Sequence, residues 1–192
     1  LLSYQAGRWK LAASFRFATG QAFTPASARI LIRDTGTEGL YLLPATMALA
    51  TLDRQSGRLE GMGLVLKQTL NSMSDHFDYV LIDCPPMLGV LMVNALAACE
   101  RLIMPVQTEF LALKGLERML HTLKMILRSR EVDLPYTIVP TFFDRRTKAS
   151  FDSLKFLKEN YPEMLWNDVI PVDTKFRESS KAGIPPTVYS PN

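Results

Sequence analysis

One carboxylate at the end of an apolar run is the feature of this sequence best placed to do chemistry. The run reads Asp78-Tyr79-Val80-Leu81-Ile82-Asp83-Cys84-Pro85-Pro86. Continuous apolar residues are typical of a strand buried on both faces of a parallel sheet, and prolines stop such a strand. Because ligands of these sheets lie beyond the carboxyl ends of the strands, we expect Asp83 to face a ligand. Such an acid commonly holds Mg²⁺ through water beside a nucleotide; an acid that caps a helix or turn is the simpler alternative.

Two segments at expected strand ends carry further candidates. Residues 85–90 have prolines at one end and a glycine nearby, a composition found in switch loops beside a γ-phosphate as well as in simple connections. Gln107 and Glu109 follow a strand that we expect to end at Val106, so they also lie at a carboxyl edge. A polar helix cap is the alternative for these two residues.

The densest basic cluster is Asp144-Arg145-Arg146-Thr147-Lys148, which comes just after another expected strand. A run of charges is usually a solvated face. The same side chains could neutralise DNA phosphates, an interaction that weakens with salt. A basic surface of this kind could be extended by Lys175, Arg177 and Lys181.

Several kinds of site find no support in the residues. The motif G-x-x-x-x-G-K-[ST] occurs nowhere, so the loop that cradles nucleotide phosphates is not encoded here. His76 and His121 are isolated, and no catalytic triad or metal-ligand set can be built around them. Cys84 and Cys99 have no metal spacing and are interpreted as packed thiols, which indicates a reducing cytoplasm.

Length and composition favour one globular domain. The chain has 192 residues, of which 47% are hydrophobic and 21% charged, enough for one sizeable core. We therefore predict a single α/β domain over 1–192. The first residue is Leu and no closing helix is expected, so we interpret both ends as cuts through a longer protein. A net charge of +3 permits contact with nucleic acid without arguing for it, and no apolar stretch is a good candidate for a membrane span.

Strands and helices are expected to alternate along the chain. Hydrophobic periodicity and turn residues predict strands at 39–44, 79–82, 101–106, 136–140 and 168–171, and helices at 45–53, 64–73, 94–99, 113–128 and 149–160. Residues 1–28 lack a clear period and are assigned only some helix. Alternation of this kind indicates βαβ units and a mostly parallel sheet.

Taken in serial order, these motifs resemble the ParA/Soj branch of the ParA/MinD deviant-Walker P-loop ATPases. The resemblance runs from about Leu40 to Pro191 and is carried by 78–86, 105–107, 143–147 and 169–171. Residues 106–112 and 143–150 look most like the ParA-like proteins of chemotaxis and flagellar gene clusters. Residues 1–38 match the family poorly.

The resemblance implies a doubly wound, mostly parallel sheet flanked by helices, P-loop NTPase-like and here missing its amino-terminal strands. It also implies an ATP- and Mg²⁺-dependent homodimer in the cytoplasm that positions cargo: chromosomes or plasmids on nonspecific DNA, or chemotaxis arrays through a polar partner protein. We expect no membrane attachment. The family's glycine-rich loop precedes the region matched here, so we expect that this chain alone does not hydrolyse ATP.

Site residues carried over by the resemblance fall in three groups. Asp83 resembles the catalytic Walker B acid that holds Mg²⁺ through water, and 85–89 resembles switch II. The nucleotide candidates are Gln107, at its strand end, and the residues at the family's adenine pocket, Thr141, Phe142, Pro171 and Asp173. Arg145 and Arg146 lie near the family's contact to nonspecific DNA.

Two alternatives remain open at this point. The chain could be a truncated, non-enzymatic binding module that keeps DNA and partner surfaces. An unrelated flavodoxin-like domain is the third interpretation, but it would need a phosphate loop after a first strand, and none is visible.

Overall fold

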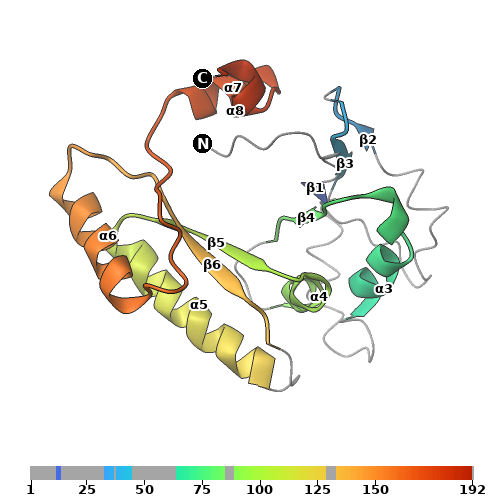
Figure 1. Ribbon diagram of the computed structural model, residues 1–192, viewed down its shortest axis with the longest axis horizontal. Helices are drawn as coiled ribbons and strands as arrows, with labels where there is room; N and C mark the ends of the chain where they lie inside the picture. Colours follow the sequence, from blue (N-terminus) through green and yellow to red (C-terminus); the bar gives the residue numbers. More distant parts are fainter. Residues whose placement is uncertain are drawn as a thin grey trace. The chain divides into compact units, whose positions relative to one another are not determined.

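The computed structural model describes residues 12–13, 33–36, 38–44, 64–84, 89–128 and 133–191 (Figure 1). The chain falls into two compact units, Leu1–Cys99 and Glu100–Asn192, and each is treated by itself below. The expectation of one domain over 1–192 stays a prediction.

The first unit holds a small, mostly parallel sheet. Its strands are β1 (Ala12–Ala13), β2 (Arg33–Asp34), β3 (Tyr41–Leu43) and β4 (Leu81–Ile82), in the order β2-β3-β1-β4. Strand β1 pairs in parallel with both β3 and β4, and β2 runs antiparallel to β3. The sequence predicted β3 and β4 but neither β1 nor β2.

The first unit also contains three helical segments. They are α3 (Val65–Asn71), the short 3₁₀ helix η3 (Ser74–His76) and α4 (Val90–Ala98). Helix α4 begins four residues before the predicted start at Asn94, directly after the extended Gly89. Its residues are apolar on all sides except for Asn94, so it lacks the amphipathic period that marks a surface helix. The helix predicted at 45–53 lies outside the described residues.

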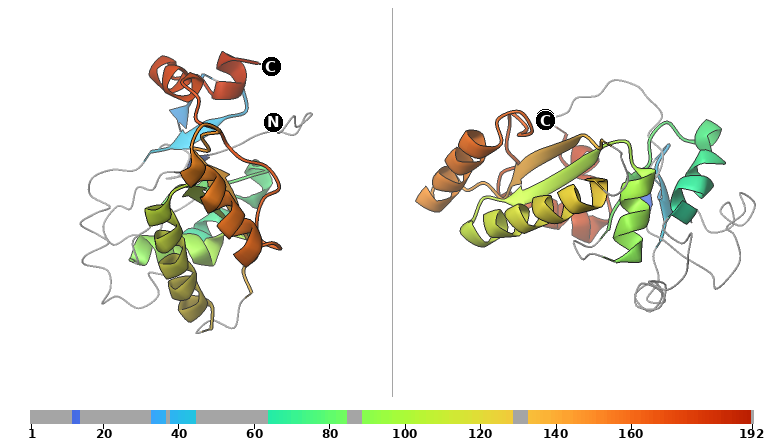
Figure 2. Two further views of the ribbon diagram at one scale, coloured as in Figure 1. Left: turned by 90° about the vertical axis from the view of Figure 1, so that its left-hand side faces the viewer. Right: turned by 90° about the horizontal axis from the view of Figure 1, so that it is seen from below.

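The second unit is built on two parallel strands and two helices. Strands β5 (Leu102–Gln107) and β6 (Tyr136–Thr141) pair along their whole length, and each is followed by a helix, α5 (Phe110–Arg128) and α6 (Lys148–Asn160). The two helices lie side by side (Figures 1 and 2). One core joins them to the strands: Met104, Val106, Leu113, Leu116, Ile138 and Leu157. This is the parallel βαβ arrangement that the sequence predicted.

Helix α5 is amphipathic, as its leucine spacing predicted. Leu116 and Leu123 are buried, whereas Lys114 lies on the exposed side and forms an ion pair of 2.8 Å with Glu117. The helix begins at Phe110, three residues before the predicted start. No described helix, α5 included, is both long and apolar enough to cross a bilayer.

Each of the two strands in the second unit contains a proline placed away from their shared ladder. The Leu102 amide donates to the Pro135 carbonyl and the Thr108 amide to the Thr141 carbonyl, both at 3.0 Å. Because amides alternate in direction along a strand, Pro105 occupies a position whose N–H would point away from β6. The Ile138 amide donates to the Met164 carbonyl, away from β5. Pro140 lies two residues further along β6, so its nitrogen also faces away from β5. Neither proline therefore removes a β5–β6 hydrogen bond.

The carboxyl end of the chain corrects two expectations. Residues 168–171 do not form a strand: Pro171 makes only an isolated parallel bridge with Phe143. Two helices follow, α7 (Lys175–Ala182) and α8 (Pro186–Tyr189), where no closing helix was expected. Gly183 ends α7 in the left-handed region at φ 67°, a conformation that glycine adopts without strain.

Candidate functional site

The carboxyl ends of β5 and β6 meet at one edge of the second unit. Gln107 and Thr141 are register partners, and the amide of the next residue, Thr108, donates to the Thr141 carbonyl at 3.0 Å. Gln107 is exposed, whereas Thr141 is buried. The strand ends therefore bring together two of the residues that the sequence singled out.

The turn after β6 adds two more of the predicted residues. Phe142 is exposed and has a φ of 52°, whereas its neighbour Phe143 is buried. The Phe143 amide donates to the Ile170 carbonyl, and the Phe143 carbonyl accepts from the Val172 amide, both at 3.1 Å. These bonds place Pro171 beside the turn. We call Gln107, Thr141, Phe142 and Pro171 the edge group.

Asp173 follows the edge group along the chain and has a local structural role. Its carboxylate accepts a hydrogen bond of 2.9 Å from the Lys175 amide, the first residue of α7. A carboxylate at this place satisfies an amide that has no partner within the helix and favours the helix dipole. Asp173 therefore helps to start α7, with its side chain exposed.

Asp144 and Arg146 form a two-pronged ion pair in the turn between β6 and α6. Arg146 donates from Nε and Nη2 to the two carboxylate oxygens, at 2.9 and 2.8 Å, and its amide also donates to the Asp144 carboxylate at 2.9 Å. These bonds, the side-chain ones foremost, lower the pKa of Asp144 from its ordinary 3.8 to about 2. The Arg146 side chain remains 85% exposed, so the pair fixes its position without hiding it.

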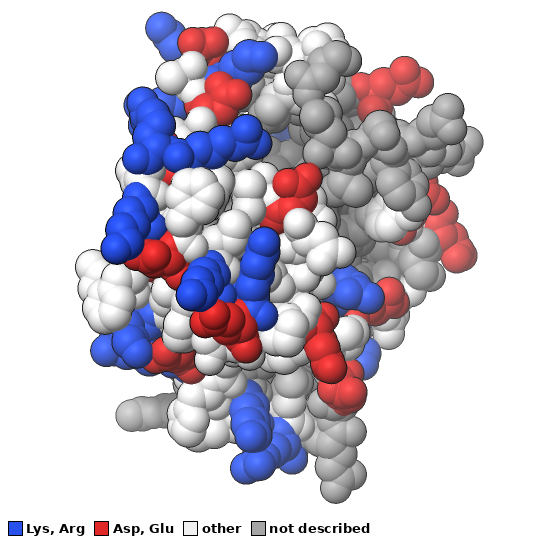
Figure 3. Space-filling model, turned by 60° about the vertical axis from the view of Figure 1, so that its left-hand side comes forward, with Lys and Arg blue, Asp and Glu red and all other residues white. Residues whose placement is uncertain are grey.

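Arg145 differs from its neighbour. It is exposed, and no ion pair ties it to any residue that the structure describes. Lys148, at the start of α6, is also exposed. On the face shown in Figure 3, Lys and Arg side chains are interleaved with Asp and Glu rather than gathered into one field. Among its described residues, this face therefore carries no continuous basic field.

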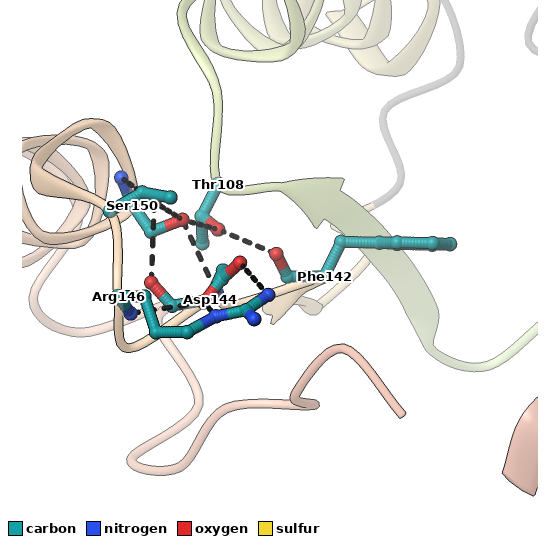
Figure 4. A network of polar contacts seen from close by, with 6 residues as sticks. Thr108, Phe142, Asp144, Arg146 and Ser150 are labelled. Atoms are coloured by element: carbon teal, nitrogen blue, oxygen red, sulfur yellow. Dashed lines mark hydrogen bonds and ion pairs between the residues drawn. The ribbon is translucent and has the colours of Figure 1, made fainter. Parts of the chain in front are cut away.

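A network of hydroxyl groups lies beneath the turn (Figure 4). Thr147 caps α6, accepting a hydrogen bond from the Ser150 amide at 3.4 Å. Its hydroxyl also lies 3.0 Å from that of Ser150, which in turn lies 3.2 Å from the hydroxyl of Thr108. Sequence reasoning missed Thr108 and Ser150. The Ser/Thr pattern of a helix cap could have indicated Thr147, but only the pairing of β5 with β6 brings in Thr108.

The predicted metal ligand belongs to the first unit, so the edge group is built without it. Asp83 directly follows β4 and is exposed. Burial raises the pKa of the neighbouring Cys84 thiol, and the Asp83 charge raises it further. Among the described residues, no cluster of three His, Cys, Asp or Glu could hold a metal ion. A single exposed carboxylate fits a cation held through water, which is how Mg²⁺ is often bound. The predicted switch, 85–89, lies outside the described residues except for Gly89.

Comparison with known proteins identifies the class of protein to which this chain belongs. A family model described as an AAA domain matches residues 21–135. The sporulation initiation inhibitor protein Soj of Bacillus subtilis (strain 168) is 32% identical over 162 residues, which are 84% of this chain and 64% of Soj. The chromosome-partitioning ATPase Soj of Treponema pallidum (strain Nichols) is 32% identical over 160 residues, 83% of this chain and 63% of that protein.

A solved structure has a similar fold. Cobyrinic acid a,c-diamide synthase from Mycobacterium smegmatis, with a bound ATP analogue and magnesium, superposes with a TM-score of 0.72 at 26% identity. The alignment covers 92% of this chain and 85% of that structure. The fold is therefore P-loop NTPase-like, as predicted.

The chain belongs to this AAA-domain family, within the ParA/Soj branch of the ParA/MinD ATPases. It spans less than two thirds of the length of the two Soj relatives.

Proposed function

We propose that this chain is part of a ParA-like ATPase that positions cellular cargo through ATP-dependent dimerisation. The Treponema pallidum relative is named a chromosome-partitioning ATPase, which supports partitioning as the role. The sequence phrases at 106–112 and 143–150 support a chemotaxis array as the other cargo. We propose homodimers, nonspecific DNA and a cargo protein as its partners.

The edge group is the observation that carries this proposal. It gathers an amide side chain, a buried hydroxyl, an exposed aromatic ring and a proline at the carboxyl edge of a parallel βαβ unit, where nucleotides commonly bind. An exposed ring can stack on a nucleotide base. We propose that Phe142 provides this surface for adenine and that Gln107 supplies a polar contact.

Asp83 is proposed as the Walker B acid. When Mg²⁺ is bound with ATP, it neutralises charge on the phosphates during transfer. The role of Asp83 would be to accept a hydrogen bond from a water molecule bound to Mg²⁺. Its carboxylate is accessible for this role, because Asp83 is exposed directly after β4. Since the sequence holds no G-x-x-x-x-G-K-[ST], we propose that the chain by itself does not turn over ATP.

A second candidate function, a DNA-binding module without hydrolysis, is favoured by the turn between β6 and α6. Arg145 and Arg146 are both exposed there, and Asp144 holds the second guanidinium in a fixed place. Since only Nε and Nη2 are used by that pair, Nη1 remains for a phosphate oxygen. This candidate shares the surface of the parent protein and differs from the first only in lacking ATP chemistry.

Binding of a fluorescent ATP analogue with Mg²⁺ tests the first proposal. We expect weak binding that Phe142→Ala reduces roughly fivefold or more, because stacking on a base contributes about 1 kcal/mol or more. Asp83→Ala should weaken only the binding that depends on Mg²⁺. Met125→Ala is the control, since Met125 lies near the end of α5 and is similarly exposed, at 53% against 59% for Phe142.

The outcomes separate the two functions. Equal affinity in Phe142→Ala and in the unaltered chain would overturn the base-stacking role. No analogue binding at all, together with salt-sensitive DNA binding, would favour the DNA-binding module. Turnover that is lost in Asp83→Ala would contradict the proposal that this chain is inactive alone.

A further inference from the structure

Phe142 combines a positive φ with an exposed aromatic side chain. It is the only non-glycine residue with positive φ among those that the structure describes, and its side chain is 59% exposed. A bulky residue in the left-handed region is strained, and such strain persists only where the surroundings over-determine the backbone. The next residue, Phe143, is 6% exposed and forms an edge contact with Phe151. Burial in the core therefore explains an aromatic residue at Phe143, but it does not explain one at Phe142.

Thr108, the residue that follows β5, holds the strained backbone of Phe142. Its amide donates to the Thr141 carbonyl at 3.0 Å, and its hydroxyl lies 3.2 Å from the Phe142 carbonyl oxygen. Thr108 is only 4% exposed, so water does not compete freely for these bonds. Thr108 therefore donates hydrogen bonds to two consecutive carbonyl groups, which lie on either side of the bond whose torsion is the Phe142 φ.

The Thr108 hydroxyl has one proton and two acceptors within reach, the Phe142 carbonyl and the Ser150 hydroxyl. A carbonyl oxygen only accepts, so the single hydroxyl proton of Thr108 goes to Phe142. Since the one proton of Thr108 is used there, the 3.2 Å contact between the Thr108 and Ser150 hydroxyls needs Ser150 as its donor. Ser150, its proton used, accepts from the Asp144 amide at 3.3 Å. A chain of bonds therefore runs from Asp144 through two buried hydroxyls to the Phe142 carbonyl.

This chain fixes the backbone on both sides of Phe143 and leaves the Phe142 ring outside it. In Figure 4 the ring points away from the polar contacts, while its carbonyl points into them. The hydrogen bonds offset the backbone strain, and the result is an exposed aromatic ring directly after the strand end at which Gln107 and Thr141 are register partners.

We infer that Thr108 is a positioning residue for this site: through the Phe142 carbonyl, it holds the exposed ring in the orientation that receives a planar heterocyclic base. The inference rests on the proposed nucleotide function. Ser150 supports Thr108 by donating to its oxygen, which leaves the Thr108 proton for the Phe142 carbonyl.

Two variants separate the hydroxyl from the shape of the side chain. Thr108→Val keeps the shape and removes the hydroxyl, and Thr108→Ser keeps the hydroxyl. A positive φ brings the amide and α protons of a residue unusually close, so the cross-peak between these protons of Phe142 in an NMR spectrum reports the strained conformation without any ligand. We expect Thr108→Val to lose this signature and Thr108→Ser to retain it. Retention in Thr108→Val would overturn the inference.

Affinity for the fluorescent ATP analogue supplies the functional readout. We expect Thr108→Val to weaken binding about as much as Phe142→Ala does, Thr108→Ser to restore it, and Thr108→Val to have no further effect in the Phe142→Ala background. Independent, additive losses would overturn the positioning role. If the unaltered chain binds no analogue, the proposed function fails, and the NMR signature still decides whether Thr108 sets the conformation of Phe142.

A measurement on the unaltered chain covers the case in which Thr108→Val does not fold. The Thr108 hydroxyl proton should exchange slowly with water and show a cross-peak to the Phe142 backbone. Rapid exchange of that proton would overturn the inference.

Discussion

The side-chain oxygen of Asn94 in α4 accepts a hydrogen bond of 3.2 Å from the backbone amide of Leu66 in α3, 28 residues earlier. The same side chain donates through its nitrogen to the Val90 carbonyl at 2.9 Å. Asn94 is 2% exposed and Leu66 is 4% exposed. The first turn of a helix has amides without partners inside the helix, so Asn94 acts as a cap supplied by a neighbouring helix. This polar residue in an otherwise apolar helix therefore ties α3 to α4.

Replacing Asn94 with Ala should destabilise the first unit by about 1–3 kcal/mol, because the buried Leu66 amide would lose its partner. Hydrogen exchange measured by NMR provides a local test: the Leu66 amide should exchange much faster in the variant. Asn71→Ala, at the exposed end of α3, is the control and should change stability by about 0.5 kcal/mol or less. An unchanged Leu66 exchange rate in Asn94→Ala would contradict the capping role.

The ion pair of Asp144 with Arg146 should dominate how this turn responds to acid. Folding lowers the pKa of Asp144 to about 2 from an ordinary value of 3.8. A group of this kind stabilises the folded state above its ordinary pKa, and the contribution is lost as the pH falls through about 2. We expect NMR of the Asp144 carboxyl carbon to show a titration midpoint near that value.

The matched variants for this titration lie side by side in the chain. Arg146→Gln should move the midpoint up toward 3.8, since it removes the two side-chain donors. Arg145→Gln removes an equal charge without touching the carboxylate and should leave the midpoint nearly in place. Similar shifts in both variants would mean that the general field, rather than the paired geometry, sets the pKa.

Substitution by alanine should change the free energy of unfolding in opposite directions at two glycines. Gly115 lies inside α5, and a β-carbon there would meet nothing within 4 Å. Gly115→Ala should therefore stabilise the second unit by about 0.5–1 kcal/mol through helix propensity. Gly183 also has open space, but its φ of 67° is unfavourable for alanine, so Gly183→Ala should destabilise by roughly 1 kcal/mol. Urea unfolding measures both, and equal signs would show that propensity is not the cause.

Contact of the β6–α6 turn with DNA should be visible in its salt dependence. For each phosphate contact removed, the slope of log K against log salt should fall by about 0.9. We expect this loss in Arg145→Gln and in Arg146→Gln, measured by anisotropy of a labelled random duplex. Lys124→Gln, an exposed cation on α5, is the control and should keep the full slope. If all three variants lose the same amount, the binding reports net charge instead of a surface at this turn.

Much of the second unit could be predicted from the sequence because its patterns are local. Strands β5 and β6 and helix α6 lie within a residue or so of the expected ranges, since each is an apolar or periodic run between turn residues. The start of α5 was missed because Phe110 and Leu111, its first two residues, are 67% and 75% exposed. Apolar side chains on the exposed face break the period by which a helix is recognised.

The site was predictable only where strand ends define it. Gln107 could be expected at this edge because it follows a predicted strand, whereas Thr141 was expected at the site only through the family resemblance. The conformation of Phe142 could not, because it depends on a hydroxyl 34 residues earlier in the chain. The same limit applies to β1 and β2, which have two residues each and form only through pairing with β3 and β4.

Pro105, which lies with its nitrogen on the side of β5 away from β6, has a consequence beyond the fold. Among the described strands, β6 is the only partner of β5, and the exposed side chain of Ile103 lies on the same strand. An exposed apolar strand can recruit identical chains and start fibril growth. Because Pro105 supplies no amide proton, a strand arriving from another molecule would find its hydrogen-bond ladder interrupted in the middle. We therefore expect Pro105 to disfavour the addition of a strand from another molecule on this side of β5, while the pairing of β5 with β6 keeps its hydrogen bonds.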